Sequence, residues 1–388
     1  METLSLSDKL SLAWRIPLLV IHCTARFTLL CLSHGEASLL NWRQKLALAY
    51  LHAFGASLTS NQQAFSLRKP LTGPRIQRYC LKHRLEHKTL PLDGSTLGDK
   101  HSTPKPVLHF VTIPNSQPDG PTILYFHGGG YHNPIRAEAH IPFLLRCAAA
   151  CHAKQIIFLE YALSPEHQYP CQLIQAVASL RFLLEEEGLE AKKLIIGGDS
   201  AGGHLTASLL THIMHPSPYA PPIDLHGDQF KAVFLVSPWL AMSAAEQAGA
   251  RAEAQHDHLT RDRMTMFTDF FNPVLDDVWC NPFEAEGSLA VWKRLFPGGC
   301  ERAVCRRAIL AVGTGEVLFD SCVGFGRDFL GGETVRVDDQ ADLDRIKERD
   351  FVLAVAPGET HVQPAIDSVV GYHDGRMMKA ILAFLGNC

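Results

Sequence analysis

The arrangement with the clearest chemical potential is a serine held between glycines. Ser200 lies in the run GDSAG at 198–202, after an apolar stretch at 193–197 and before apolar residues at helical spacing in 204–212. These patterns predict a strand that turns sharply into a helix, with Ser200 at the corner. Small neighbours permit the strained backbone of such a turn, and the first amides of the helix favour negative charge beside the hydroxyl. Ser200 is the candidate nucleophile, although GxSxG alone also fits an ordinary glycine-rich turn.

A second glycine motif complements the serine. The apolar run 122–126 leads into HGGG at 127–130. Glycines at the end of a strand expose N–H groups that no side chain covers. The N–H groups of Gly128 and Gly129, with that of Ala201, are therefore predicted to form an oxyanion hole. Each donor would stabilise a tetrahedral transition state by roughly 3 to 4 kcal/mol. A flexible glycine loop is the alternative, and two such motifs at strand ends argue against it.

Three motifs together resemble the hormone-sensitive-lipase-like branch of the α/β-hydrolase fold. They are HGGG at 127–130, YALSPEHQYP at 161–170 and GDSAGG at 198–203. The resemblance runs from about Pro106 to His361. It implies esterase activity and a catalytic triad in the chain order serine, acid, histidine. It also implies that the middle segment supports the serine turn from behind, so Glu166 receives no chemical role.

The histidine of the triad is sought after a late strand. His361 follows the apolar run 351–355 through a short loop that contains proline and glycine. Such a loop is well suited to delivering an imidazole to the carboxyl end of a sheet, so His361 is the predicted base. His373 is the alternative.

The acid is assigned from the resemblance. After the apolar run 308–312, the segment GTGEVLFD at 313–320 looks like the family's DPLxD segment with glutamate in its first acidic position. In relatives the first acid pairs with the histidine, so the resemblance gives Glu316 the role of orienting His361. Asp320 takes the second position, where it would start a helix, and is the alternative acid.

The elements around these motifs predict an α/β fold with a largely parallel sheet covered on both faces. Strands are expected at 107–113, 122–126, 155–160, 193–197, 230–236, 308–312 and 351–355, and helices at 141–151, 172–187 and 204–212. Residues 104–388 would form the catalytic domain, with an aromatic cap insertion at about 238–297. Its aromatic side chains either wall an apolar binding site or form the core of the cap.

Residues 1–103 are predicted to form a helical cap region followed by a basic, proline-rich connection at 71–103. Residues 10–32 read as a helix, started near Pro17, with one polar stripe. The stripe consists of Arg15, His22, Arg26 and Ser33. A membrane span with two arginines would be costly, and no cleavage site follows an uninterrupted apolar stretch. The helix therefore either packs its apolar face over the catalytic domain, helping to wall the substrate pocket, or lies on a membrane surface. A second helix is expected at 42–54.

Composition limits the classes of function. The chain has 388 residues and a net charge of −4, which gives no basic field for nucleic acid. Eleven cysteines without paired metal-binding spacing imply neither a disulfide framework nor a metal site, so a reducing, cytoplasmic setting is expected, with membrane association as an alternative.

The predicted reaction is hydrolysis of a small to medium apolar ester, without metal or organic cofactor. A non-hydrolytic step on the same machinery, such as elimination, acyl transfer or carbon–carbon chemistry in a natural-product pathway, is the alternative, because a fold does not fix a reaction. A binding protein without catalysis is disfavoured, since both Ser200 and His361 are present. The oligomeric state has no signature in the sequence.

Overall fold

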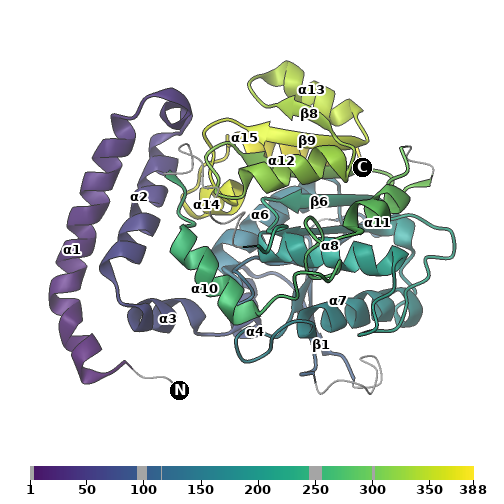
Figure 1. Cartoon of the computed structure of the whole chain (residues 1–388), viewed down its shortest axis with the longest axis horizontal. Helices are drawn as coiled ribbons and strands as arrows, with labels where there is room; N and C mark the ends of the chain where they lie inside the picture. The colour runs from purple at the N-terminus through teal and green to yellow at the C-terminus, as the bar shows by residue number, and fades with distance from the viewer. Residues whose placement is uncertain (1–3, 94–102, 115, 244–255, 299–301) are drawn as a thin grey trace.

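A mixed, mostly parallel sheet forms the centre of the molecule (Figure 1). The computed structural model describes residues 4–93, 103–114, 116–243, 256–298 and 302–388, and these contain nine strands in the order β1-β2-β4-β3-β5-β6-β7-β9-β8. The strands are β1 (His87–Pro91), β2 (Val107–Thr112), β3 (Thr122–Phe126), β4 (Gln155–Glu160), β5 (Leu194–Asp199), β6 (Ala232–Val236), β7 (Ala308–Gly313), β8 (Glu333–Arg336) and β9 (Phe351–Ala356). Strand β2 is antiparallel to both of its neighbours, and the other pairs are parallel. The predicted α/β fold is confirmed.

Two strands at the edges of the sheet were not predicted. Strand β1 lies within the segment predicted as a connection, which also contains helix α4 (Thr72–His83), so that prediction is wrong for these residues. Strand β8 is short and largely polar. Strands at the edge of a sheet are less covered than central strands, so they do not require a continuous apolar run. Residues 94–102 of the predicted connection lie outside the described residues.

The sheet separates two hydrophobic cores. Successive side chains of a strand point to opposite faces, so Ile123 and Tyr125 of β3 join one core while Leu124 and Phe126 join the other. Helices α4, α6 and α15 pack into the first core, and α7, α8, α11 and α12 pack into the second. This burial on both faces explains why the central strands are apolar throughout their length.

Among the described residues of the catalytic region there are nine α-helices, and bounds were predicted only for the first three. The nine are α6 (Ala137–Ala150), α7 (Cys171–Arg181), α8 (Ala201–Met214), α10 (Arg261–Phe271), α11 (Ser288–Leu295), α12 (Phe319–Asp328), α13 (Gln340–Glu348), α14 (Gln363–Val369) and α15 (Arg376–Leu385). Helix α6 starts four residues earlier than the predicted 141, so Pro142 lies inside it. A π-helical turn at Phe182–Glu186 follows α7.

The N-terminal residues form a helical hairpin beside this domain (Figure 1). Helix α1 (Leu6–Cys31) packs along α2 (Trp42–Ser57), and α3 (Ser60–Arg68) leads towards α4. Ser5 caps α1 by accepting a hydrogen bond from the N–H of Asp8, so the helix starts well before Pro17. The prediction that Pro17 marks the start is therefore wrong.

The orientation of α1 corrects a second expectation. Its polar stripe, rather than its apolar face, turns towards α2: Arg15 donates to the carbonyl of Ser57, and His22 Nδ1 lies 2.9 Å from Ser57 Oγ. The wide apolar face of α1 does not cover the catalytic domain. It points to solvent because the two polar side chains have found partners at the end of α2.

Candidate active site

A strained turn between β5 and α8 presents Ser200. Its φ of 52° and ψ of −119° lie outside the regions that a serine ordinarily adopts. The glycines around it are needed for close backbone approach: a Cβ on Gly202 would lie 1.9 Å from the carbonyl oxygen of Phe126, and one on Gly198 would lie 2.3 Å from that of Gly202. The turn is fixed by hydrogen bonds from Ser200 N–H to the Val236 carbonyl and from Trp239 N–H to the Ser200 carbonyl.

Three residues from the ends of different strands meet at this turn. Ser200 Oγ lies 2.9 Å from His361 Nε2, and His361 Nδ1 lies 3.3 Å from Glu316 Oε2. All three side chains are buried. Glu316 follows β7 and His361 follows β9, whose carboxyl ends meet at the same edge of the parallel sheet as that of β5. The chain brings a hydroxyl, an imidazole and a carboxylate into one hydrogen-bonded line, the arrangement that activates a serine.

The structure separates Glu316 from the two alternative candidates. Asp320 lies in the first turn of α12 with an exposed side chain, and His373 is also exposed. Glu316 is fully buried and accepts hydrogen bonds at Oε1 from Ser237 Oγ at 2.6 Å and from the N–H of Gly313 at 2.7 Å. Burial raises the pKa of Glu316, against the effect of its hydrogen bond with His361.

Burial and neighbouring carboxylates have opposite effects on the pKa of His361. Its burial disfavours the charged form, but the hydrogen bond and charge of Glu316, followed by the charge of Asp257, outweigh burial and raise the pKa of His361. A base with a raised pKa is stabilised as the imidazolium that forms when it accepts the serine proton.

Asp257 is a buried carboxylate that the sequence reasoning missed. Its Oδ2 accepts the N–H of Val317 at 2.9 Å, and its Oδ1 accepts the N–H of His361 at 3.3 Å. Asp257 therefore joins the loop that carries Glu316 to the loop that carries His361. The ring of His258 lies beside it, with Nδ1 at 3.3 Å from Oδ1. The one sequence signal was the cluster HDH at 256–258 within the predicted cap insertion.

The N–H groups of the glycine loop differ in whether the structure gives them an acceptor. The N–H of Gly128, which the sequence assigned to the oxyanion hole, is donated to Asp199 Oδ1 at 2.9 Å. Among the described residues, no acceptor is present for the N–H groups of Gly129 and Gly130. Ala201 is the first residue of α8, so its N–H has no acceptor within the helix. The N–H groups of Gly129, Gly130 and Ala201 are therefore without an acceptor among these contacts, whereas that of Gly128 is occupied by Asp199.

Asp199 holds this loop against the serine turn. Its buried carboxylate also accepts a hydrogen bond from Tyr125 Oη at 2.7 Å and lies 3.2 Å from His140 Nε2. Burial opposes its ionisation, but the charge and hydrogen bond of His140 and the bonds from Tyr125 and Gly128 lower the pKa of Asp199. An anion at this position binds the end of β3 to the end of β5, which fixes the distance between the glycine loop and Ser200.

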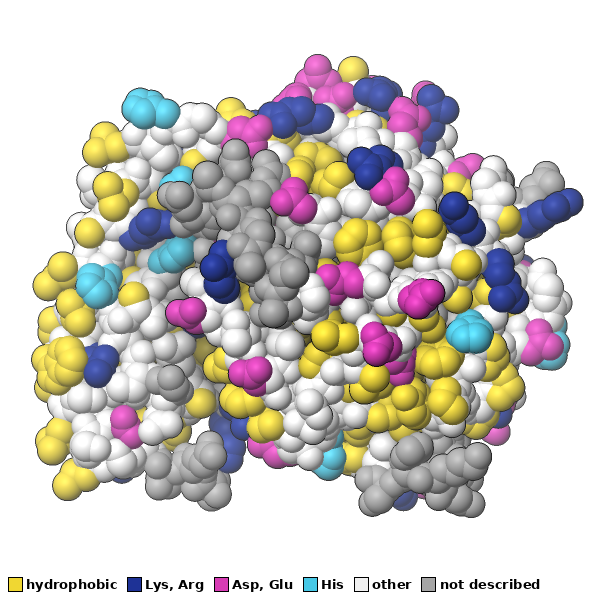
Figure 2. Space-filling model, in the orientation of Figure 1, with side chains coloured by type: hydrophobic (Ala, Val, Ile, Leu, Met, Phe, Trp, Pro, Cys, Tyr) yellow, Lys and Arg dark blue, Asp and Glu magenta, His cyan; other side chains and the backbone are white. Residues whose placement is uncertain are grey.

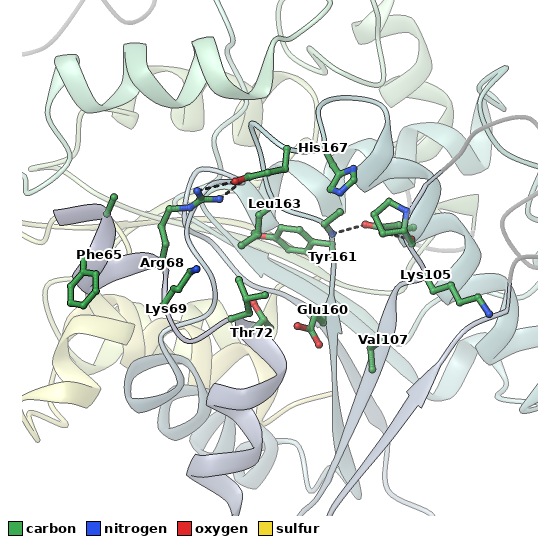
Figure 3. A pocket seen from close by; sticks show the side chains of 16 residues that line it. Phe65, Arg68, Lys69, Thr72, Lys105, Val107, Glu160, Tyr161, Leu163 and His167 are labelled. Carbon is green, nitrogen blue, oxygen red and sulfur yellow. Dashed lines mark hydrogen bonds and ion pairs between the residues drawn. The ribbon is translucent and has the colours of Figure 1, made fainter. Parts of the chain in front are cut away.

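The segment 161–170 lies behind the glycine loop and beside a separate cavity. Tyr161 Oη donates to the carbonyl of His127 at 2.6 Å, and the two rings stack with centroids 4.5 Å apart. On the other side, Tyr161 and Leu163 line a cavity of about 630 Å³ (Figure 3). Arg68 and Glu166 also line it, and their side chains are paired by two hydrogen bonds. Neither Ser200 nor His361 lines this cavity, and Glu166 serves in an ion pair.

Aromatic side chains of the predicted cap insertion are mostly core. Trp239, Phe271 and Trp292 are fully buried, and the ring of Phe271 stacks on Tyr131 with centroids 4.3 Å apart. Phe267 packs against Gly130, where any Cβ would clash with its ring. These contacts brace the glycine loop from the side of the insertion. Residues 244–255 of the insertion lie outside the described residues.

In the described part of the chain, no group of three or more His, Cys, Asp or Glu side chains is arranged to hold a metal ion. The buried histidines near the site are instead paired with protein groups. Tyr131 Oη lies 2.5 Å from His204 Nδ1, and burial lowers the pKa of His204 to about 4. His204 is thus a neutral structural residue near the serine turn.

Comparison with known proteins places the chain in the α/β-hydrolase fold family. Residues 123–320 match the α/β-hydrolase fold family. The chain is 28% identical over 152 residues to arylacetamide deacetylase-like 2 of Homo sapiens, which covers 36% of this chain and 38% of that protein. It is 31% identical over 135 residues to carboxylesterase NlhH of Mycobacterium tuberculosis, which covers 32% of this chain and 37% of that protein.

These matches span under two fifths of the length of the two relatives. The similarity of fold extends further. The crystal structure of an esterase from the bacterial hormone-sensitive lipase family superimposes with a TM-score of 0.62 at 17% identity, over 90% of this chain and 98% of that one.

Proposed function

The chain belongs to the α/β-hydrolase fold family, and from this premise we propose that it is a carboxylesterase of the hormone-sensitive-lipase-like branch with Ser200 as nucleophile. The proposed triad is Ser200, His361 and Glu316, and the proposed oxyanion donors are Gly129, Gly130 and Ala201. The proposed substrate is a small to medium apolar ester.

The observation that carries the proposal is the line of contacts from Ser200 through His361 to Glu316. Ser200 Oγ and His361 Nε2 are within hydrogen-bond distance at 2.9 Å, in a turn whose backbone strain would serve no purpose in a merely structural serine. The carboxylate at 3.3 Å from Nδ1 holds the tautomer in which Nε2 is free to accept a proton.

The reaction follows from these positions. His361 Nε2 takes the Ser200 proton as Oγ bonds to the ester carbonyl carbon, and the carbonyl electron pair moves to the oxygen, where the N–H donors stabilise it. Collapse of this intermediate breaks the bond to the alcohol, which leaves with the proton from His361. Water then gives a proton to His361 and attacks the acyl carbon, and Ser200 leaves with that proton. No metal or organic cofactor takes part.

Hydrolysis of a p-nitrophenyl ester series from acetate to palmitate tests this function, with the wild type beside Ser200→Ala. We expect the wild type to cleave the shorter esters and the substitution to remove the activity, because it deletes the attacking oxygen. Equal activity of the two proteins would contradict the proposal.

Labelling with a fluorophosphonate separates the remaining outcomes. If the wild type cleaves no ester but Ser200 reacts with the probe, the nucleophile is active and serves a narrow substrate or a non-hydrolytic reaction of the same fold. If Ser200 is also inert, the chain is a binding protein on this fold.

A further inference from the structure

Helix α1 has the reverse of the usual polarity for a surface helix. The side chains that face the other helices of the hairpin include polar ones: Arg15 and His22 lie within hydrogen-bond distance of Ser57 at the end of α2, and Ser11 accepts a hydrogen bond from Gln62 of α3. The outward face is apolar. From residue 10 to residue 32, all of which the structure describes, the exposed side chains are Leu10, Ala13, Trp14, Ile16, Pro17, Val20, Ile21, Thr24, Ala25, Thr28, Leu29, Cys31 and Leu32. None of them is charged.

This face is large and continuous. Leu10 is 67% exposed, Ile21 is 63% exposed and Leu32 is 68% exposed, and residues 10–32 extend over about 33 Å of helix. Hydrophobic side chains follow α1 along the left edge of the molecule (Figure 2). Trp42, at the start of α2, adds a further exposed aromatic side chain to the hairpin. Exposed apolar patches of this extent are typical of surfaces that bind a membrane or another protein.

Basic residues are concentrated in the N-terminal part of the chain, and this distribution distinguishes a membrane from a second copy of the chain as the partner of the apolar face. Residues 1–92 contain twelve Lys and Arg against four Asp and Glu, whereas residues 93–388 contain twenty-four against thirty-six. The apolar face therefore belongs to the basic part of an acidic protein. An apolar face carried by a basic part of the chain is complementary to a bilayer with anionic lipids. Two copies of this chain joined through the same face would instead bring two basic regions together.

We propose that α1 docks the protein on an anionic lipid surface, lying in the plane of the membrane with its outward face in the interface. By length and composition α1 is also able to cross a bilayer. Spanning would, however, withdraw Arg15 and His22 from Ser57 and place them with Arg26 in hydrocarbon, which is expensive. In the plane of the membrane, those contacts remain and only the exposed side chains leave water.

Co-sedimentation of the full chain with vesicles tests the proposal. The probes are vesicles of phosphatidylcholine alone and of phosphatidylcholine with about 30% phosphatidylserine. We expect preferential binding to the anionic vesicles, weakened by added salt because counterions screen the basic residues. The double substitution Leu10→Glu and Ile21→Glu should reduce the bound fraction roughly tenfold. Both side chains are already exposed, so the fold is retained.

Val274→Glu is the matched control, because Val274 is an exposed apolar residue outside the hairpin. It should bind as the wild type does, and all three proteins should hydrolyse a soluble ester equally. The vesicle result does not depend on that activity, so either proposal can fail alone. Three results would overturn membrane docking in the plane: no binding of the wild type, equal binding of the double variant, or binding that resists alkaline carbonate and therefore spans the bilayer. A wild-type dimer that the double substitution splits, without vesicle binding, would assign the face to a second copy.

Discussion

At the scale of single residues, two buried carboxylates face His361 and differ in what they touch. Glu316 contacts the imidazole itself through Oε2. Asp257 accepts the backbone N–H of His361 and that of Val317, next to Glu316. The first orients the proton-accepting ring, and the second positions the two loops and adds negative charge. They should therefore respond differently to loss of charge.

Glu316→Gln should lower kcat for ester hydrolysis by about 10³- to 10⁴-fold, because an amide no longer stabilises the imidazolium or selects its tautomer. Steady-state kinetics with a short p-nitrophenyl ester provides the measurement. Asp320→Asn is the control, since its exposed side chain lies in the first turn of α12, and it should stay within about twofold of the wild type. A larger effect at Asp320 than at Glu316 would exchange their assignments.

Asp257→Asn should move the pH profile rather than abolish activity. The base form of His361 is active, so kcat/KM of the wild type should fall as pH drops through an apparent pKa above 6.5, since the pKa of His361 is raised. Asp257 contributes to that rise, so its neutralisation lowers the pKa and shifts the acid limb to lower pH. An unchanged profile with only a reduced kcat would mean that Asp257 has a purely structural role.

At the scale of elements, the site depends on how closely β3, β5 and α8 approach one another. The start of α8 passes so near the end of β3 that Gly202 has no room for a methyl group. Asp199 ties the same two strands through Tyr125 and Gly128. The distance between the proposed nucleophile and the proposed oxyanion donors is thus set by backbone contact, which is the most rigid kind available in a fold.

Gly202→Ala should destabilise the protein by about 3 kcal/mol or more, because the new Cβ meets backbone atoms that cannot rotate away. Thermal unfolding and fluorophosphonate labelling of Ser200 should both report the damage. Gly55→Ala is the matched control: its Cβ would have an ordinary contact at 3.4 Å with Arg263, and alanine favours the helical interior of α2. It should be neutral or stabilising. Equal behaviour of the two variants would contradict the packing argument.

What the sequence could predict depends on whether the information is local. The turn at Ser200 and the loops that carry Glu316 and His361 are local patterns after apolar strands, and the structure brings the three together. Asp257 belongs to no such pattern, because its contacts join segments far apart in the chain. The polar stripe of α1 was also visible, but periodicity does not say which face meets the protein. That choice depended on partners at Ser57.

At the scale of the whole molecule, a buried polar cluster joins the N-terminal hairpin to the loop of His361. Gln44 of α2 donates to Asp367 of α14, and Glu359 accepts the N–H groups of Arg376 and Met377 at the start of α15. The carboxylates of Glu359 and Asp367 both flank Gly375. Since His361 lies between Glu359 and Asp367 in sequence, the attachment of the hairpin and the position of the proposed catalytic base depend on one cluster.

This cluster should make stability depend on pH. Burial and the neighbouring charge of Glu359 raise the pKa of Asp367 from 3.8 to about 8. Between these values the folded chain keeps a proton that the unfolded chain releases, so the free energy of unfolding should fall as pH rises through this window, by up to about 1.4 kcal/mol per pH unit.

Asp367→Asn carries no titrating group and keeps an acceptor for Gln44, so it should flatten the slope of the free energy of unfolding against pH. Urea denaturation from pH 5 to about 8.5 measures it. Asp374→Asn, at an exposed ion pair with Lys379, should leave the slope intact. If both variants keep the wild-type slope, the proton resides elsewhere and the link between hairpin and catalytic loop is not titratable.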